Sequence, residues 1–203
     1  MKLLKDARLV DKHYQNKSLY IDYCSHKVAV YSVLRWHYSR RMPKSKLVRF
    51  GVWEYGKFIG AIIYGCGVNP NIGGFLKLGM HEITELLRVA LNNHQAPVSK
   101  IVAISMKLLK KDFPKIRALV SYADPEQNHK GKIYQAMNWY YIGNTNPARK
   151  YFKNGKFFHS RTMADRDLST YKRVKTKPKY KYCYLFDKKL FKLIENSIKD
   201  YIA

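Results

Sequence analysis

The sequence has few cysteines, few acidic residues and no long hydrophobic run. Its three cysteines, Cys24, Cys66 and Cys183, are far apart and form no C-x-x-C pair. Neither a disulfide framework nor a cysteine zinc site is predicted. The amino-terminal segment is charged every few residues and lacks an apolar stretch long enough for a signal peptide or a spanning helix. We therefore expect a cytoplasmic protein.

The scarcity of acidic residues leaves a large positive charge. The chain has 39 Lys and Arg against 14 Asp and Glu, which gives a formal net charge of +25. Self-repulsion on this scale opposes a compact fold, so the surplus is typical of a protein with a polyanionic partner. Nucleic acid is the first candidate, although composition alone does not separate DNA from RNA or a membrane surface.

Length and hydrophobic content predict one folded domain over residues 1–203. A chain of this size, with 46% hydrophobic residues and no compositionally simple window, can bury one core. Residues 26–38 predict a short helix, and residues 47–54 and 58–65 predict a β-hairpin. Residues 81–90 favour a strand beside this hairpin, with a helix as the open alternative.

The clearest helix begins at residues 96–99 and carries an apolar stripe up to Phe113-Pro114. After it, residues 116–122 predict a buried strand, residues 132–139 a helix and residues 139–143 a second strand. A crossover of this kind predicts that the two strands are neighbours in one sheet.

The segment 146–192 is the basic half of the surface, with fifteen Lys and Arg against three Asp. Within it, residues 151–158 predict a two-stranded hairpin, because Asn154-Gly155 is a strong turn signal. Residues 180–186 alternate aromatic and other side chains, which predicts a half-buried last strand, and residues 188–201 predict a final helix.

One long segment, VSYADPEQNHKGKIYQAMNW from Val120 to Trp139, strongly resembles the Mom family of phage DNA modification proteins. Trp36-His37-Tyr38-Ser39, Glu85-Leu86-Leu87-Arg88 and the amphipathic helix around residues 104–111 support the resemblance, which spans roughly residues 30–190. The resemblance implies an α/β (α+β) fold related to the GNAT acetyltransferases. We expect a mixed central sheet flanked by helices, with a basic hairpin insertion at residues 144–179 before the last strand.

The activity implied by the resemblance is conversion of adenine in double-stranded DNA to its N6-carbamoylmethyl derivative. This modification protects phage DNA from restriction, so the protein would be phage-encoded and would act in the host bacterial cytoplasm. Alkylation of N6 requires a base to remove its proton. The adenine must also leave the base stack, with aromatic side chains replacing the lost stacking.

One departure from the acetyltransferase pattern concerns the group donor. The usual phosphate loop, Arg or Gln followed by x-x-Gly-x-Gly or Ala, is missing before the 96–111 helix, where NNHQAPVS stands at residues 92–99. Backbone amides at Val98 and Ser99, with Arg88, could still hold an anionic small-molecule donor. An acyl-CoA-like donor is one candidate, but the donor stays unassigned.

The candidate chemical centre combines side chains from the Mom-like motifs. His37, with Tyr38 and Asp124, is the first choice, and it would act as a base or a metal ligand. The structural alternatives are a packed histidine and an aspartate that caps a turn before Pro125. The catalytic candidates are His37, Tyr38, Arg88, Ser105, Asp124 and Tyr134.

The resemblance also implies bound iron, for which His37, Asp124 and Tyr134 would supply nitrogen and oxygen ligands. Tyr134 could instead stack on a base. Arg88 would neutralise the donor or pair with a nearby glutamate, Glu85 or Glu82. Ser105 would act in catalysis or simply pack within the apolar stripe of its helix.

The proposed partner is double-stranded DNA, with no membrane partner and with a homodimer as an open possibility. The hairpin around Asn154-Gly155 is the element expected to enter a groove. Each phosphate neutralised adds about 0.9 to the negative slope of log affinity against log salt. The phosphate-binding candidates are Arg40, Arg41, Lys44, Lys46, Arg149, Lys150, Lys153, Lys156, Arg161, Arg173, Lys175, Lys177 and Lys179.

Two other functions stay open. One is a GNAT-like acyltransferase that acts on RNA or a protein amine, and the missing phosphate loop argues against it. The other is a non-catalytic basic DNA-binding protein, in which His37 and Asp124 would have no special role.

Overall fold

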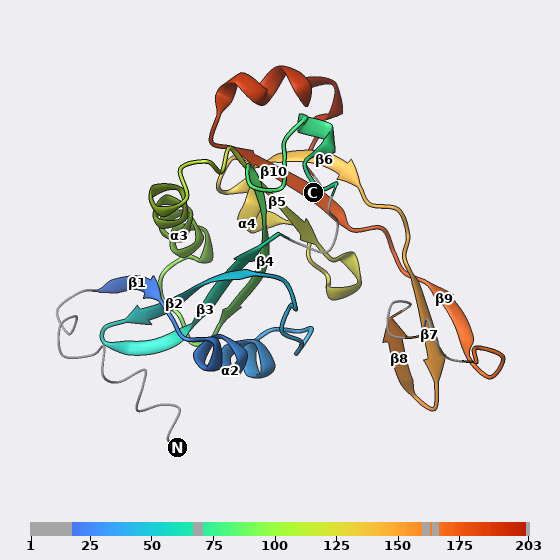
Figure 1. The fold of residues 1–203 in the computed structure, drawn as a ribbon. Helices are drawn as coiled ribbons and strands as arrows, with labels where there is room; N and C mark the ends of the chain where they lie inside the picture. Colours follow the sequence, from blue (N-terminus) through green and yellow to red (C-terminus); the bar gives the residue numbers. More distant parts are fainter. Residues whose placement is uncertain (1–17, 67–70, 160–162, 164–166, 202–203) are drawn as a thin grey trace.

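The computed structural model describes residues 18–66, 71–159, 163 and 167–201. In these ranges the strands form a seven-stranded sheet, β1-β2-β3-β4-β5-β10-β6, and a separate three-stranded sheet, β8-β7-β9 (Figure 1). Neighbouring strands are antiparallel except β4 and β5, which are parallel. The strands are β1 (Leu19–Tyr23), β2 (Leu47–Glu54), β3 (Lys57–Gly65), β4 (Ile83–Leu91), β5 (Ala118–Ala123), β6 (Tyr140–Asn144), β7 (Arg149–Lys153), β8 (Lys156–His159), β9 (Lys172–Lys175) and β10 (Tyr180–Leu185).

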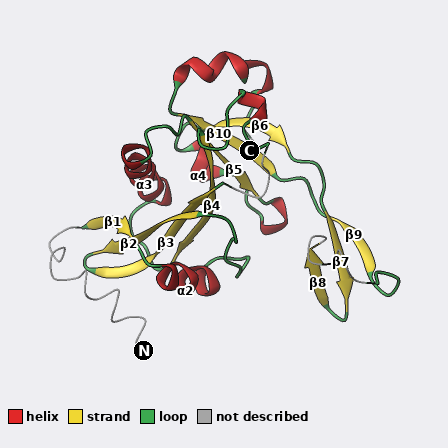
Figure 2. Ribbon diagram, viewed as in Figure 1, coloured by secondary structure: helices red, strands yellow, loops and turns green. Residues whose placement is uncertain are grey.

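Helices cover both faces of the large sheet (Figure 2). On one face, α3 (Val98–Asp112) and the short α4 (Lys132–Gln135) pack over the largest core cluster. On the other face, α2 (His26–Trp36) packs over a smaller cluster. The 3₁₀ turns η2 (Gly74–Leu76), η5 (Lys188–Leu193) and η6 (Glu195–Ser197) adjoin a third cluster there. Within the described ranges, no helix is both long and apolar enough to cross a membrane.

The small sheet is inserted between β6 and β10, the last strand, and it lies apart from the large sheet (Figure 1). The two linkers run side by side, because the amide of Thr145 donates to the Lys179 carbonyl and the amide of Thr176 donates to the Ala148 carbonyl. Asn154 and Gly155 both have positive φ, 49° and 73°, as expected for the predicted tight turn. The basic insertion before the last strand is therefore confirmed.

Several sequence predictions are confirmed and others are wrong. The segment predicted at residues 81–90 forms a strand rather than a helix, at Ile83–Leu91, and the predicted hairpin is present as β2 and β3. β5 and β6 are not neighbours, because β10 lies between them and pairs with both. The insertion contains a third strand, β9, where only a hairpin was expected, and β1 was not expected at all.

Two predicted helices are shorter than expected. The 132–139 helix ends at Gln135, since the chain turns through Asn138 at a positive φ of 56° and the amide of Trp139 donates back to the Tyr134 carbonyl. The 188–201 segment forms only the 3₁₀ turns η5 and η6. The first turn ends at Ile194, where φ is −115°, and the second ends at Ile198, whose backbone is extended, so no continuous α-helix forms.

Candidate functional site

The large sheet splits between β4 and β5. These strands pair only from Ile83 with Ala118 to Glu85 with Val120, after which β4 follows β3 and β5 follows β10. Leu87 is an extra residue in β4, because Leu86 lies opposite Tyr64 and Arg88 opposite Ile63. A bulge of this kind bends a strand and ends its pairing. The split therefore opens the interior of the sheet to both faces.

A hollow of about 360 Å³ occupies this split. Successive strand residues point to opposite faces, so its wall includes side chains from both sides of the sheet. From the α3 face come Leu86, Val89, Leu91, Val98, Ser121, Ile133 and Tyr134, and from the α2 face come Trp36, His37, Tyr38, Arg88, Tyr122 and His129. The hollow thus crosses the sheet from one face to the other.

Ser121 and Tyr134 connect the separated strands across the hollow. The Ser121 hydroxyl donates to the Leu86 carbonyl at 2.8 Å, and the Tyr134 hydroxyl lies 2.7 Å from the same Ser121 oxygen. Serine has one hydroxyl proton, so Tyr134 is the donor to Ser121. Burial raises the pKa of Tyr134 to about 12, and its ring packs on those of Tyr182 and Trp139. Tyr134 is therefore a fixed, neutral phenol in the wall.

Gly131 places α4, and with it Tyr134, against this wall. Its φ of +81° is unfavourable for other residues, and a Cβ there would lie 2.4 Å from the Tyr182 ring. Replacing Gly131 would therefore displace the helix that carries Tyr134.

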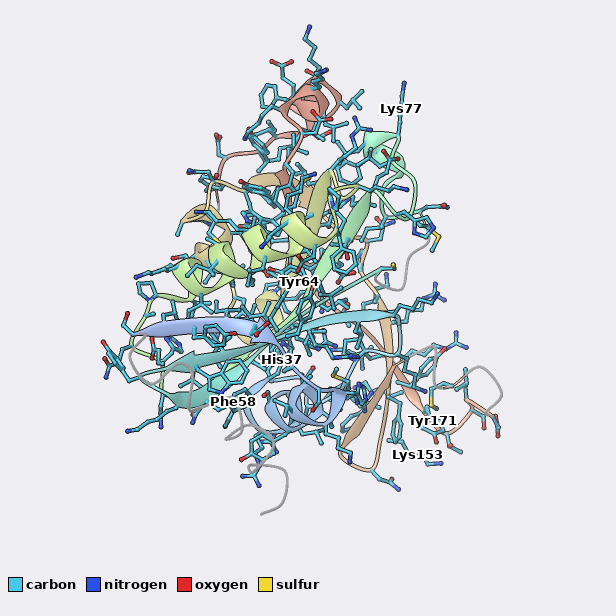
Figure 3. The ribbon with its side chains drawn as sticks, turned by 60° about the vertical axis from the view of Figure 1, so that its left-hand side comes forward. His37, Phe58, Tyr64, Lys77, Lys153 and Tyr171 are labelled. Carbon is cyan, nitrogen blue, oxygen red and sulfur yellow. The ribbon has the colours of Figure 1, made fainter. Side chains whose placement is uncertain are left out.

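Ser105 lies on the buried face of α3 and does not line the hollow. Its hydroxyl donates to the Val102 carbonyl at 2.7 Å, so the buried Tyr64 hydroxyl, 2.7 Å away, donates to Ser105. Figure 3 shows Tyr64 next to α3. Ser105 is therefore a packed core residue, which was the structural alternative predicted for it.

His37 directly follows α2 (Figure 3) and lines the hollow. Burial, then the charges of Arg88, His129 and Lys179, lowers the pKa of His37 to about 3, so the ring is neutral at physiological pH. Its Nδ1 accepts the amide hydrogen of Ser39 at 3.1 Å. The ring proton of neutral His37 is therefore on Nε2, and His37 presents a hydrogen-bond donor rather than a lone pair.

Tyr38 stands beside His37 at the edge of the hollow. The two rings are 4.4 Å apart, and the ring of His129 meets Tyr38 edge-on at 5.5 Å. The side chain of Tyr38 is 45% exposed although it is large and aromatic. The three rings form an accessible aromatic surface on the α2 side of the hollow.

Glu85 is a further candidate that does not line the hollow, although it is next to the lining residue Leu86. It is the last β4 residue paired with β5, on the same face as Arg88. Burial raises the pKa of Glu85 from its ordinary 4.5 to about 7, against the opposing charges of Arg88 and Lys179. A carboxylate in the apolar strand ITELLRVAL was the available signal, but it was taken only as a partner for Arg88.

Arg88 lines the hollow and donates to the carbonyls of Arg41 and Leu87 at 3.3 and 2.6 Å. The predicted alternative of an ion pair with Glu82 is wrong, since Glu82 pairs with Arg117 at 3.0 Å. Arg88 is therefore placed where it can meet an anionic group.

Asp124 is on the same side of the molecule as His37 but does not line the hollow. The amide of His129, a lining residue, donates to its carbonyl. One carboxylate oxygen accepts the Glu126 amide at 3.0 Å, and the other lies 2.8 Å from Lys179 Nζ. This is the turn-capping role that was the structural alternative, reinforced by an ion pair.

The predicted iron ligands do not fit this arrangement. Asp124 is paired with Lys179, the Tyr134 hydroxyl donates to Ser121, and His37 carries its proton on the nitrogen not bound by Ser39. Within the described ranges, no group of three or more His, Cys, Asp or Glu side chains could hold a metal ion. No step of the chemistry is therefore assigned to iron.

Some backbone amides at the start of α3 are hydrogen-bonded to a carboxylate, and others are free to bind a ligand. Val98 lines the hollow, and Ser99 lines a second cavity of about 380 Å³ on the far side of the helix start. Just before the helix, the carboxylate of Glu54, 4% exposed, accepts the amides of Gln95 and Ala96 at 2.7 and 2.5 Å. An internal anion thus occupies the loop where the phosphate motif is missing.

The predicted phosphate-binding residues lie on two surfaces. Arg40, Arg41, Lys44 and Lys46 are exposed in the loop after Tyr38, whereas Arg149, Arg173, Lys175 and Lys177 are exposed on the small sheet or its linker. Lys150 and Lys179 are already paired, with Glu126 at 2.6 Å and with Asp124. Lys153 donates to Thr170. Arg161 and the side chain of Lys156 lie outside the described residues.

Solved structures of similar fold include acetyltransferases. An aminoglycoside acetyltransferase in complex with coenzyme A and kanamycin matches with a TM-score of 0.54 and 12% identity, covering 86% of this chain and 98% of that chain. The ribosomal-protein-S5-alanine acetyltransferase from Vibrio fischeri matches with a TM-score of 0.50 and 10% identity, covering 85% and 95%. The predicted GNAT-like α/β fold is confirmed.

Sequence comparison gives the family. Methylcarbamoylase Mom of Escherichia phage Mu is 29% identical over 154 residues, which cover 74% of this chain and 64% of that protein's length. Residues 18–202 match the Mom protein family, so the similarity includes β1 and exceeds the predicted span of residues 30–190. The chain belongs to the Mom protein family.

Proposed function

We propose that this chain modifies adenine in double-stranded DNA by attaching a carbamoylmethyl group to N6, and that it protects phage DNA from restriction in the host bacterial cytoplasm. Membership of the Mom family and the relative named methylcarbamoylase support the activity. The net charge of +25 suits a DNA substrate. The observation that carries the proposal is the hollow that crosses the sheet and is lined by rings and hydrogen-bonding groups.

The two faces of the hollow would receive the two reactants separately. The extruded adenine enters on the α2 side, where the rings of Tyr38 and His129 can replace lost stacking. The exposed cations that follow Tyr38 hold the DNA backbone at this entrance. The donor enters on the side of α3, next to Val98. The reactants then meet at the split between β4 and β5.

The chemical roles follow from protonation states. As N6 forms its bond to the methylene carbon of the carbamoylmethyl group, the bond from that carbon to the donor breaks, the donor leaves with the electron pair, and N6 loses a proton. Glu85 does not line the hollow, but its charge acts on the lining residues Tyr122 and Tyr134, and its pKa is raised to about 7, so it is the group proposed to receive the proton. His37 donates from Nε2 to an acceptor nitrogen of the purine and so orients the base. The neutral Tyr134 hydroxyl, fixed by Ser121, accepts a hydrogen bond from the amine. These roles replace that of His37 as the base.

The donor is a small molecule with an anionic part, of which an acyl-CoA-like compound is one form. The acetyltransferase of similar fold is described in complex with coenzyme A. In this chain Glu54 already occupies the amides of Gln95 and Ala96, and Pro97 has no amide hydrogen. A donor anion would therefore bind at the free amides of Val98 and Ser99 and at Arg88.

The test is expression in a restriction-deficient bacterium, followed by digestion of the DNA to nucleosides and mass spectrometry. We expect a new deoxyadenosine species with the mass of the carbamoylmethyl derivative. Unmodified adenine in cells that contain abundant, folded protein would refute the proposal and favour a non-catalytic DNA-binding protein. Modified RNA or protein amines would favour the acyltransferase alternative.

Two tyrosines provide a matched pair of variants. Tyr134→Phe and Tyr64→Phe each remove one buried hydroxyl that donates to a serine. Tyr134 lines the hollow, so its variant should lose most of the modified adenine. Tyr64 does not line the hollow, so its variant should keep normal modification wherever the protein stays folded. Equal effects of the two variants on modification would remove the role proposed for Tyr134.

A further inference from the structure

An aromatic pair stands on the small sheet among basic residues. Phe152 on β7 and Phe157 on β8 are directly opposite each other, with ring centres 4.9 Å apart. Phe157 is 56% exposed, in contrast to the buried Tyr151 next along β7. A single exposed phenylalanine is ordinary on a protein surface. Phe157 differs because basic residues lie near it and because its face of the small sheet is turned toward the rim of the hollow.

Lys150 shows which way the face points. Side chains alternate along a strand, so Lys150 and Phe152 share the face that carries Phe157. Lys150 Nζ lies 6.0 Å from the centre of the Phe157 ring and 2.6 Å from Glu126, a residue of the 3₁₀ turn η3 (Pro125–Gln127). This turn leads directly to His129 in the wall of the hollow. The aromatic pair is thus on the side of the small sheet that contacts the rim of the site.

The surrounding charge matches a DNA backbone. On the face of the aromatic pair, the exposed Lys172 of β9 lies opposite Phe152. Arg149, Arg173 and Lys175 are exposed on the other face of the same sheet, and Lys177 is exposed in its linker. Such residues bind phosphates without reading sequence. The tight turn at Asn154-Gly155 makes the β7–β8 end narrow, as a ribbon that enters a groove must be.

We propose that Phe157, supported by Phe152, is a wedge that inserts into the duplex next to the target adenine. This inference rests on the proposed function, because an adenine can reach the hollow only after it leaves the stack. An apolar side chain inserted between base steps fills the space and lowers the cost of extrusion. Lys172, opposite Phe152, holds the backbone next to the wedge, and the cations of the other face and of the linker add to the attraction for the duplex.

The main experiment needs no donor. Duplexes that carry the fluorescent base 2-aminopurine in every nearest-neighbour context are mixed with the purified full chain, and the fluorescence increase on unstacking is measured. We expect a strong increase with the unmodified chain and with Phe157→Trp, and a loss of most of it with Phe157→Ala. Duplex affinity should change much less, since the cations are unaltered.

A second DNA substrate distinguishes the loss of the wedge from a general loss of DNA binding. With an abasic site opposite 2-aminopurine, extrusion no longer requires strand opening, so Phe157→Ala should regain the signal. Phe113→Ala is the matched control, because Phe113 is also exposed, at 40%, but lies at the opposite end of α3 from the hollow. In cells, Phe157→Ala should lower adenine modification roughly tenfold or more.

Each failure has its own signature. Unchanged fluorescence with Phe157→Ala, or an equal loss on matched and abasic duplexes, would overturn the wedge. A normal fluorescence increase from a chain that leaves adenine unmodified in cells would instead contradict the proposed function while keeping the wedge.

Discussion

Glu85 gives a stability prediction with a definite sign. Its pKa is about 7 in the folded protein and near 4.5 when the chain is unfolded. Between these values the folded state binds more protons than the unfolded state, so wild-type stability falls as pH rises from about 4.5 to about 7. Glu85→Gln cannot ionise and avoids this loss. We therefore expect the variant to be more stable than the wild type at pH 8.

The magnitude follows from the two pKa values. At about 1.4 kcal/mol for each pH unit between them, the cost of ionising Glu85 reaches roughly 3 kcal/mol above pH 7. At pH 5 the two proteins should differ by less than about 1 kcal/mol. Urea unfolding from pH 5 to pH 8 measures this difference directly.

Glu82 provides a control of opposite sign. Hydrogen bonds from the Gly79 amide and Arg117 lower the pKa of Glu82, so Glu82→Gln should become less stable than wild type as pH rises through the acid range. If Glu85→Gln were destabilised at pH 8, or shifted equally at all pH values, Arg88 and Lys179 would outweigh burial at Glu85. Its role as a proton acceptor of near-neutral pKa would then be lost.

Three further predictions concern other parts of the chain. The lowered pKa of His37 means that stability is lost as pH falls from about 6.5 towards 3, so His37→Gln should unfold less readily than wild type on acidification, as followed by circular dichroism. Glu54→Gln keeps one amide acceptor and should cost about 1–2 kcal/mol, whereas Glu54→Ala should cost more, measured by urea unfolding. Arg173→Gln should reduce the salt slope of DNA binding by about 0.9, and Lys150→Gln by less, because Lys150 already pairs with Glu126.

The main sheet was predictable where local signals were strong. The Tyr55-Gly56 turn and the alternating strands around it specify the β2–β3 hairpin, and Asn154-Gly155 specifies the β7–β8 hairpin. The apolar stripe of α3 was equally clear, since Ile101, Ser105 and Leu109 all face the core.

The wrong predictions of strand order, by contrast, concern strands that pair although they are distant in the sequence. β10 takes the place next to β5 because both Tyr182 and Cys183 are buried, which marks a central strand with partners on both sides. β9, with the sequence KRVK, has almost no apolar pattern and exists through its register with β7. Neither choice is encoded within a short window, so local periodicity could not reveal it.

In the hollow, too, the local sequence around a side chain does not determine its surroundings. Ser105 and Ser121 have equivalent local chemistry, since each donates to a backbone carbonyl and accepts from a buried tyrosine. Only Ser121 lies where two parallel strands stop pairing, and that separation depends on the extra residue at Leu87 in another strand. The difference between a core hydrogen bond and one in the wall of the hollow is therefore set by the bulge. Removing Leu87 from the bulge should close the split and convert the Ser121 site into a second packed pair like that of Ser105.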